Sequence, residues 1–136
     1  MENSLELKTV VKSDYRFLYK LLEERNPITN ISHKKIPTYK QHVKFVKSKP
    51  YSKWYIIYLN HRKVGSIYFS KQDEIGMFFI KKIKKEGIGK NAMEVLMKKN
   101  PRERYIANSN PKNTKLIKFL KKNGFKLVQY SYELTK

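Results

Sequence analysis

The chain has 136 residues, enough to form one domain, residues 1–136, with a core of its own. Hydrophobic residues make up 40% of it, which excludes a disordered chain, and the lack of cysteine excludes disulfides, thiolate metal sites and cysteine nucleophiles. The formal net charge of +20 favours a polyanionic partner, but only five of the 31 basic residues are arginine, so a lysine-rich solvated surface is the preferred interpretation and dedicated nucleic-acid binding the alternative.

The N-terminal third is predicted to hold one strand and two helices. LELKTVV at 5–11 alternates as a strand does, and Ser13 is placed to cap a helix. The apolar face of that helix would consist of Phe17, Leu18, Leu21 and Leu22. Residues 27–37 are expected to form a loop, after which Thr38 and Gln41 have the spacing of a capping box that starts a second helix.

Three β-rich runs follow, at 53–60, 63–70 and 73–80, and their short links predict antiparallel neighbours. Beyond a turn with two glycines, a helical stripe is formed by Ile88, Ala92, Met93, Leu96 and Met97. A further strand is expected at 104–109.

The C-terminal part predicts one more helix and a closing strand. Asn113 or Thr114 starts the helix, and Gly124 is placed to end it. Residues 125–134 have the composition of a strand. The order β-α-α-β-β-β-α-β-α-β predicts an α/β fold of the mixed α+β kind, with a mostly antiparallel twisted sheet flanked by helices and one strand–helix–strand crossover after residue 73.

The stretch KKEGIGKN at 84–91 joins a strand to a helix and predicts an anion site. Gly87 and Gly89 allow the backbone to approach an anion, and N–H groups at a helix N-terminus favour negative charge. Lys84, Lys85 and Lys90 would add positive charge around it. A tight connection without a ligand is the alternative interpretation.

The stretch KKEGIGKNAMEVL resembles the acetyl-CoA pyrophosphate loop of the GCN5-related N-acetyltransferases, whose pattern is Q/R-x-x-G-x-G/A. The layout of ANSNPKNTKLIKFLKKNGF at 107–125 is similar to that family's downstream asparagine, helix and GF, with Asn113 twelve residues before Phe125. The predicted element order is also the family's. RNPITN and IPTYKQHVKFV resemble the bacterial branch that acetylates amino sugars.

The resemblance implies an acetyltransferase that moves an acetyl group from acetyl-CoA to a primary amine by direct attack. The amine would belong to a small molecule, an amino sugar above all, or to a protein. Main-chain N–H groups near Phe79 and Lys81, before the turn, would bind the pantetheine arm and polarise the thioester carbonyl. The cofactor-binding residues implied are Phe79, Ile80, Lys81, Lys84, Lys85, Glu86, Gly87, Ile88, Gly89, Lys90, Asn108 and Asn113.

Two positions depart from the family pattern. Lys84 stands where the family has Gln or Arg, and Leu120 stands where many members have a tyrosine that protonates the departing thiolate. Tyr130 or Tyr132 on the last predicted strand could supply that hydroxyl instead, or the thiolate could leave without a proton.

The remaining candidates concern the amine. Glu74 resembles the catalytic glutamate of the histone-acetylating branch and is our candidate general base, although a polar strand start is an equal alternative. His42, Tyr39 and Trp54 would border the acceptor site or serve in packing. The three histidines share no ligand spacing, so no metal is expected.

A second function class stays open. The aromatic strands could stack bases within a lysine-rich surface, which would make the chain a nucleic-acid-binding module without catalytic activity. The small-molecule amine is the favoured partner, and the state would be a monomer or a homodimer. The longest apolar runs have six residues, so no membrane span is expected, and we predict a cytoplasmic protein.

Overall fold

The computed structural model describes residues 4–25, 35–83 and 87–136. Five strands form one sheet in the order β1-β2-β3-β4-β5, in which the first four are antiparallel and β5 runs parallel to β4. The strands are β1 Leu5–Thr9, β2 Lys53–Leu59, β3 Arg62–Phe69, β4 Glu74–Phe79 and β5 Ile106–Ala107. The helices are a short 3-10 turn, η1 Lys12–Asp14, then α1 Tyr15–Glu24, α2 Tyr39–Lys47, α3 Ile88–Lys99 and α4 Thr114–Lys122. This confirms the predicted fold class.

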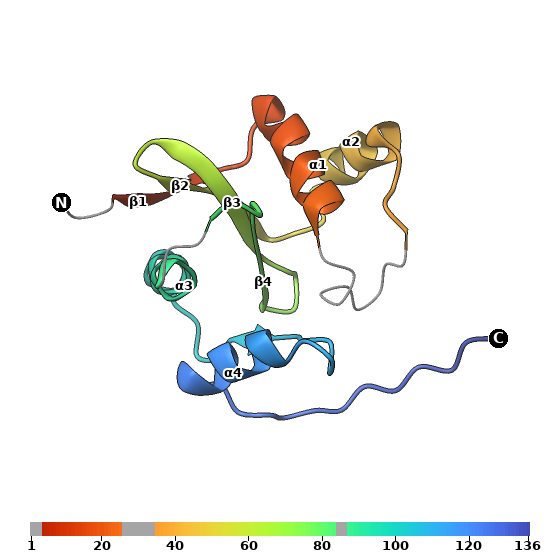
Figure 1. Cartoon of the computed structure of the whole chain (residues 1–136), viewed down its shortest axis with the longest axis vertical. Helices are drawn as coiled ribbons and strands as arrows, with labels where there is room; N and C mark the ends of the chain where they lie inside the picture. The colour runs from red at the N-terminus through yellow and green to blue at the C-terminus, as the bar shows by residue number, and fades with distance from the viewer. Residues whose placement is uncertain (1–3, 26–34, 84–86) are drawn as a thin grey trace.

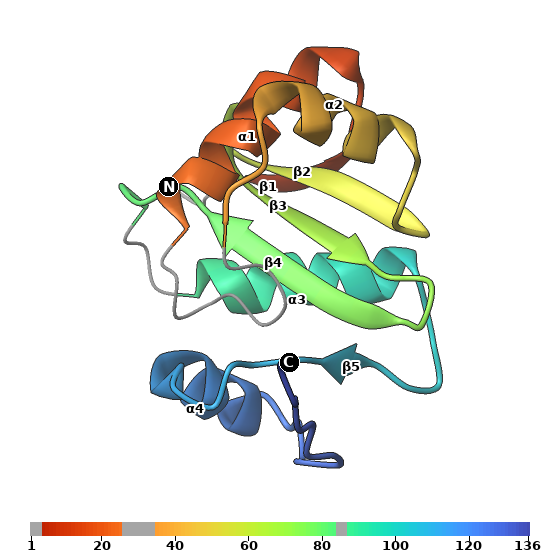
Figure 2. The ribbon, with the colours of Figure 1, turned by 90° about the vertical axis from the view of Figure 1, so that its right-hand side faces the viewer.

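Helices cover both faces of the sheet (Figures 1 and 2). Helices α1 and α2 lie on one face and α3 on the other, with α4 beside β5. Side chains of β2 alternate between the two sides: Ile56 packs with α1 and α2, whereas Tyr55 and Ile57 pack with α3. Burying each such aliphatic side chain contributes about 1.5–3 kcal/mol, which explains why this strand is apolar at almost every position.

The start of α1 differs from the prediction by one residue. Asp14, not Ser13, occupies the N-cap position. The Asp14 carboxylate is buried, accepts a 2.9 Å hydrogen bond from the Val11 N–H, and pairs with the Lys63 Nζ at 2.6 Å. This pair fixes the first turn of α1 to β3. Ser13 and Asp14 are both good caps, so the sequence alone did not distinguish them.

The capping box at the start of α2 is confirmed. The Gln41 N–H donates to Thr38 Oγ1 at 3.2 Å, and the Thr38 N–H donates to Gln41 Oε1 at 2.9 Å. Most of the loop predicted for 27–37 lies outside the described residues. Within those that are described, no helix has the length and apolarity needed to cross a membrane.

The prediction of a last strand at 125–134 is wrong. Figure 1 shows the chain leaving α4 and running away from the sheet, and every residue from 126 to 136 is exposed. The strand expected at 104–109 shrinks to two residues, so β5 offers almost no ladder to a further strand. Alternating apolar residues indicate only that a segment fits a pleated surface, and here the neighbouring strand is too short to provide one.

Candidate active site

The edge of β4 that faces β5 is mostly open. The two strands pair only at Glu74 with Ile106 and at Ile75 with Ala107, so among the described residues the rest of this edge has no strand beside it. On the opposite edge the Ile80 N–H donates to the Val64 carbonyl at 2.9 Å. Because N–H groups alternate in direction along a strand, those of Phe79 and Lys81 face the open edge.

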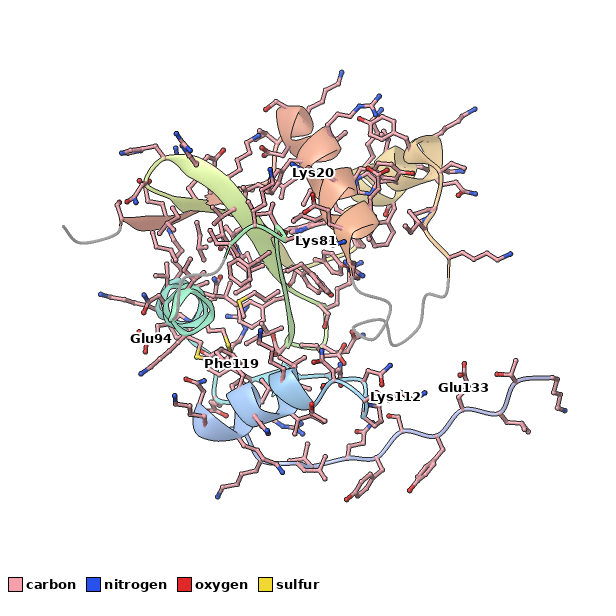
Figure 3. The ribbon with its side chains drawn as sticks, in the orientation of Figure 1. Lys20, Lys81, Glu94, Lys112, Phe119 and Glu133 are labelled. Atoms are coloured by element: carbon pink, nitrogen blue, oxygen red, sulfur yellow. The ribbon has the colours of Figure 1, made fainter. Side chains whose placement is uncertain are left out.

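The end of α1 reaches this open edge. Glu24 Oε1 accepts a 3.1 Å hydrogen bond from the Lys81 N–H, so one of the two predicted donors already holds a carboxylate. Figure 3 places Lys81 just beside α1. Phe79 therefore presents the other predicted donor on this edge, and among the described residues no side chain is seen to occupy it.

The N-terminus of α3 lies close to β4 and α4. Gly87 is its N-cap with φ of 80°, a conformation that favours glycine, and nothing would meet a Cβ there within 4 Å. A Cβ on Gly89 would lie 3.3 Å from both Met77 Cε and Phe119 Cζ, and Figure 3 shows Phe119 on the inner side of α4. Lys84, Lys85 and Glu86, also predicted to bind the anion, lie outside the described residues.

The first N–H groups of α3 are available to a ligand. The first helical bond runs from the Asn91 N–H to the Gly87 carbonyl at 2.9 Å, so the preceding amides of Ile88, Gly89 and Lys90 have no acceptor within the helix. The side chain of Lys90 is exposed and 4.0 Å from Glu94. The start of α3 lies against β4, because a Cβ on Gly89 would come within 3.3 Å of Met77 Cε, two residues before Phe79.

Three predicted residues are engaged with the protein itself. Asn113 Oδ1 caps α4 by accepting the Leu116 N–H at 3.2 Å. The Asn108 side-chain amide donates to Glu74 Oε2, while the Ser70 hydroxyl donates to Glu74 Oε1 at 3.0 Å. Asn108 and Glu74 are thus brought together at the point where β4 and β5 still pair.

Glu74 lies at the far end of β4 from the predicted donors. Five residues separate it from Phe79, about 16 Å at ~3.3 Å per strand residue. Side chains two and four residues apart share a face, so Glu74 and Phe78 both lie on the side of the sheet covered by α1 and α2. Glu74 would reach an amine near Phe79 only through intervening groups or water.

A cavity opens on that face, between α1, α2 and strands β2 to β4. Its volume is about 390 Å³, a figure that includes the open space at its mouth. Trp54 and His42, two of the residues predicted to border an acceptor, line this cavity. Tyr39 does not: its ring packs on Tyr19 at 5.4 Å between centroids, under the guanidinium of Arg16.

His42 has a structural partner as well as a place in the cavity wall. Its Nε2 lies 3.1 Å from the Tyr15 carbonyl oxygen, and only 2% of the residue is exposed. Burial lowers the pKa of His42, and the hydrogen bond to Tyr15 opposes that change only in part. The imidazole is therefore neutral near pH 7, which agrees with the packing role left open by the sequence.

Stacked aromatic rings form one wall of the cavity. Tyr51 and Tyr68 lie parallel with centroids 3.8 Å apart, and the edge of Trp54 meets Tyr51 at 4.7 Å. The indole N–H of Trp54 donates to Ser66 Oγ at 2.8 Å. The Tyr68 ring covers Gly76, where any Cβ would overlap it, so glycine at this position of β4 is what allows the stack to form.

Arg25 is a cavity residue that the sequence analysis missed. Its guanidinium carbon lies 3.7 Å from the centroid of the Phe78 ring, and its buried Nε has no hydrogen-bond partner among the described residues. Burial lowers the pKa of Arg25. The only signal was an arginine at a helix C-terminus, where basic residues are common, so nothing pointed to the cavity.

The two tyrosines proposed to protonate the thiolate are not brought to the site. Tyr130 is 73% exposed and Tyr132 is 91% exposed, both on the segment that leaves the sheet. Their placement depended on the last predicted strand, which does not form. Leu120, which replaces the family tyrosine, is half-buried on α4.

No family model matches the sequence, and no curated protein matches it either. Several solved structures do match the chain in their fold. A domain from Methanocaldococcus jannaschii DSM 2661 has 21% identity and a TM-score of 0.82, covering 97% of this chain and 94% of its own. The aminoglycoside N-acetyltransferase AAC(6')-Iy in complex with CoA has 13% identity and a TM-score of 0.73, and the match covers 100% of this chain and 97% of that protein.

A third solved structure is that of RimL, a ribosomal-protein alpha-N-acetyltransferase, in complex with coenzyme A. It has 18% identity and a TM-score of 0.74, covering 93% of this chain and 82% of its own. At these identities the likeness establishes the fold. The chain has the fold of the GCN5-related N-acetyltransferases, with helices on both faces of a mostly antiparallel sheet.

Proposed function

We propose that this chain is an acetyl-CoA-dependent N-acetyltransferase, with all 136 residues in one acetyltransferase-like domain. The observation that carries the proposal is the juxtaposition along β4: an open edge that the Phe79 N–H faces as a donor, the N-terminus of α3 beyond it, and a mostly apolar cavity on the face covered by α1 and α2. A thioester held along that edge would meet an amine held in the cavity.

The cofactor site combines two sets of main-chain donors. The amides of Ile88, Gly89 and Lys90 fit a diphosphate, because unpaired N–H groups at a helix N-terminus favour anions. The Phe79 N–H fits the thioester carbonyl, and each such donor is typically worth ~3–4 kcal/mol in stabilising the developing oxyanion. When bound, acetyl-CoA supplies the acetyl thioester. The two neighbours solved with coenzyme A support this assignment.

The reaction transfers one acetyl group without a covalent enzyme intermediate. The amine lone pair attacks the carbonyl carbon, the carbon–sulfur bond breaks, and the nitrogen loses one proton. With Tyr130 and Tyr132 away from the cavity, the thiolate leaves without a protein acid, which its ordinary pKa of about 8.5 permits. Glu74 is our proposed acceptor of the amine proton, acting through water because of its distance along β4.

An amino sugar is the acceptor class we favour for this site. Its nitrogen is less basic than a lysine amine, so a larger fraction is uncharged at pH 7 and the demand on a distant base falls. The aromatic wall of Tyr51, Tyr68 and Trp54 also suits the flat apolar face of a sugar ring.

The nucleic-acid-binding alternative receives less support. Base stacking needs exposed rings on the sheet, but Trp54 and Tyr68 line the cavity beneath α1 and α2 and Tyr55 is buried against α3. If the chain were a base-stacking module, its affinity for single-stranded nucleic acid would fall steeply with increasing salt and would not change when coenzyme A is added.

Thermal unfolding with and without coenzyme A tests the proposal. At a hundred times the dissociation constant, the ligand should add about 2.7 kcal/mol, a rise of several degrees in Tm. Release of free thiol from acetyl-CoA over a panel of amines then measures turnover. An unchanged Tm at millimolar coenzyme A, confirmed by calorimetric titration, would rule out the proposed cofactor site.

The role of Glu74 has its own test. Glu74→Gln keeps hydrogen bonding to Ser70 but cannot accept a proton, so kcat/KM should fall most at low pH, where few amine groups are already uncharged. Glu103→Gln, at an exposed position, is the control. Equal pH profiles for Glu74→Gln and the unsubstituted protein between pH 6 and 9 would remove Glu74 from the mechanism.

A further inference from the structure

The cavity contains a charge that the described residues do not neutralise. Arg25 is the C-cap of α1 and lines the cavity with Phe78, yet no carboxylate of the described chain forms an ion pair with it. Its Nε is buried and makes no hydrogen bond within that part of the chain. Burying a charged group without a partner costs free energy, and the contact with the Phe78 ring offsets only part of that cost.

The groups around Arg25 cannot complete the pairing. Burial raises the pKa of Tyr51, with a smaller contribution from Tyr68, so the Tyr51 phenol stays protonated and uncharged at neutral pH. The Tyr68 ring is stacked on the Tyr51 ring, with centroids 3.8 Å apart. This corner of the cavity thus combines the Arg25 guanidinium with the Tyr51 hydroxyl, both able to donate, and apart from His42 and Ser66 most of the other lining residues are apolar or aromatic.

Such a corner is suited to an anion of the acceptor. A guanidinium presents N–H donors in a planar fork that matches a carboxylate or a phosphate, and hydrogen bonds between charged partners are the strong ones. The same charge repels a polycation. An aminoglycoside, a polyamine or a lysine-rich peptide would bring like charge close to Arg25 in a cavity lined mainly by apolar and aromatic side chains.

We propose that the amine acetylated at this site also carries an anionic group, a carboxylate or a phosphate, which pairs with Arg25 while the apolar body of the molecule rests on Tyr68 and Trp54. This inference rests on the proposed function and narrows its acceptor class. Two sources share the chemistry: a phosphorylated amino sugar, and an amino acid with an apolar side chain.

Binding measurements on matched pairs of products separate these sources from their neutral counterparts. The probes are N-acetylglucosamine 6-phosphate against N-acetylglucosamine, and N-acetylphenylalanine against its amide. Trp54 is the only tryptophan of the chain and lines the cavity, so its fluorescence reports occupancy directly. We expect the anionic member of at least one pair to bind about tenfold tighter or more. Whichever pair responds identifies the source.

Turnover with the corresponding amines should follow the same order. Glucosamine 6-phosphate against glucosamine, and phenylalanine against phenylalaninamide, give kcat/KM ratios in the thiol-release assay. The kcat/KM of the preferred anionic amine should be about tenfold higher than that of its neutral counterpart. The difference should lie mainly in a lower KM, because Arg25 contacts the acceptor away from the reacting nitrogen. A neutral or polycationic amine that matches or exceeds both anions overturns the inference.

Substitutions of Arg25 test the residue itself. Arg25→Met removes the charge and should erase the preference for the anion in binding, whereas Arg25→Lys should keep part of it. Arg16→Met is the matched control, since Arg16 lies on the same helix and also stacks on a ring, Tyr39, but outside the cavity. A preference that survives in Arg25→Met contradicts the proposal.

Stability separates a binding role from a structural one. If Arg25 is an unneutralised charge awaiting a ligand, Arg25→Met should unfold at the same Tm as the unsubstituted protein or higher. A clearly lower Tm would show instead that stacking on Phe78 serves the fold.

Failure of this inference can be told apart from failure of the proposed function. Coenzyme A binding is measured on the same samples. If coenzyme A binds and no anion is preferred, only the acceptor assignment is overturned. If coenzyme A does not bind, the proposed function fails, while the fluorescence of Trp54 still decides whether the cavity selects anions.

Discussion

Replacing Gly87 by alanine separates the conformational role of this glycine from its proposed role in binding. Its φ of 80° is in the left-handed region, and a Cβ there would meet nothing within 4 Å. Gly124 has the same two properties, with φ of 90° and open space around it. The two glycines lie at ends of different helices, so Gly124→Ala is the matched control.

The expected cost in stability is the same for both substitutions. Holding an alanine in the left-handed region costs about 1–2 kcal/mol, and the lower entropy of the unfolded alanine chain offsets about 0.4–1 kcal/mol of that cost. The net loss is therefore about 1 kcal/mol, or roughly 3–5 °C in Tm for a chain of this length. No clash adds to it, because both sites are open.

The expected effects on coenzyme A differ. In Gly87→Ala the new methyl group occupies space next to the amides of Ile88 and Gly89, where the diphosphate is proposed to lie, so we expect the dissociation constant to rise about tenfold, equivalent to ~1.4 kcal/mol. Gly124→Ala should leave it unchanged. Calorimetric titration measures both. Equal affinities for the two variants, with equal losses of stability, would refute the placement of the diphosphate at the start of α3.

Three further predictions concern the rest of the fold. Asp14→Ala should cost about 3 kcal/mol in urea unfolding because it breaks a buried pair with Lys63, whereas Glu94→Ala, in an exposed pair, should cost less than ~1 kcal/mol. Burial lowers the pKa of His42, so as the pH drops below about 6.5 the unfolded state binds a proton before the folded state does, and the free energy of unfolding should fall. His42→Gln should make the free energy of unfolding less dependent on pH in this range. An unchanged pH dependence in His42→Gln would contradict the prediction. Removing residues 127–136 should leave Tm within about 1 °C, since the segment is exposed throughout, and a larger loss would mean that it packs on the protein.

The sequence predicted best those elements whose determinants are local. The capping box of Thr38 and Gln41 lies within one turn, and both of its hydrogen bonds form. The strands β2 to β4 follow one another through short links, so their pairing needs no long-range information. Most of the fold could therefore be derived before the structure was known.

The failures come from contacts between distant parts of the chain. Residues 125–134 have the pattern of a strand, but pairing depends on β5, which is only two residues long. Tyr130 and Tyr132 were placed near the thiolate only because they lay on that predicted strand, so without it they remain exposed and away from the site. Arg25 was missed for the opposite reason: an arginine at a helix end has an ordinary local explanation, and only the packing of α1 over Phe78 gives it another.

Two neighbouring residues at the end of α1 link the two halves of the site. Glu24 accepts the Lys81 N–H two residues beyond the end of β4, while Arg25 enters the cavity against Phe78 on that strand. Consecutive Cα atoms lie about 3.8 Å apart, so an anion held by Arg25 is fixed relative to the edge that Glu24 contacts. The acceptor and the thioester are then oriented by one short segment of backbone, and the Asp14–Lys63 pair holds the other end of the same helix to β3. Loosening α1 at Asp14 should therefore impair acceptor selection as well as stability.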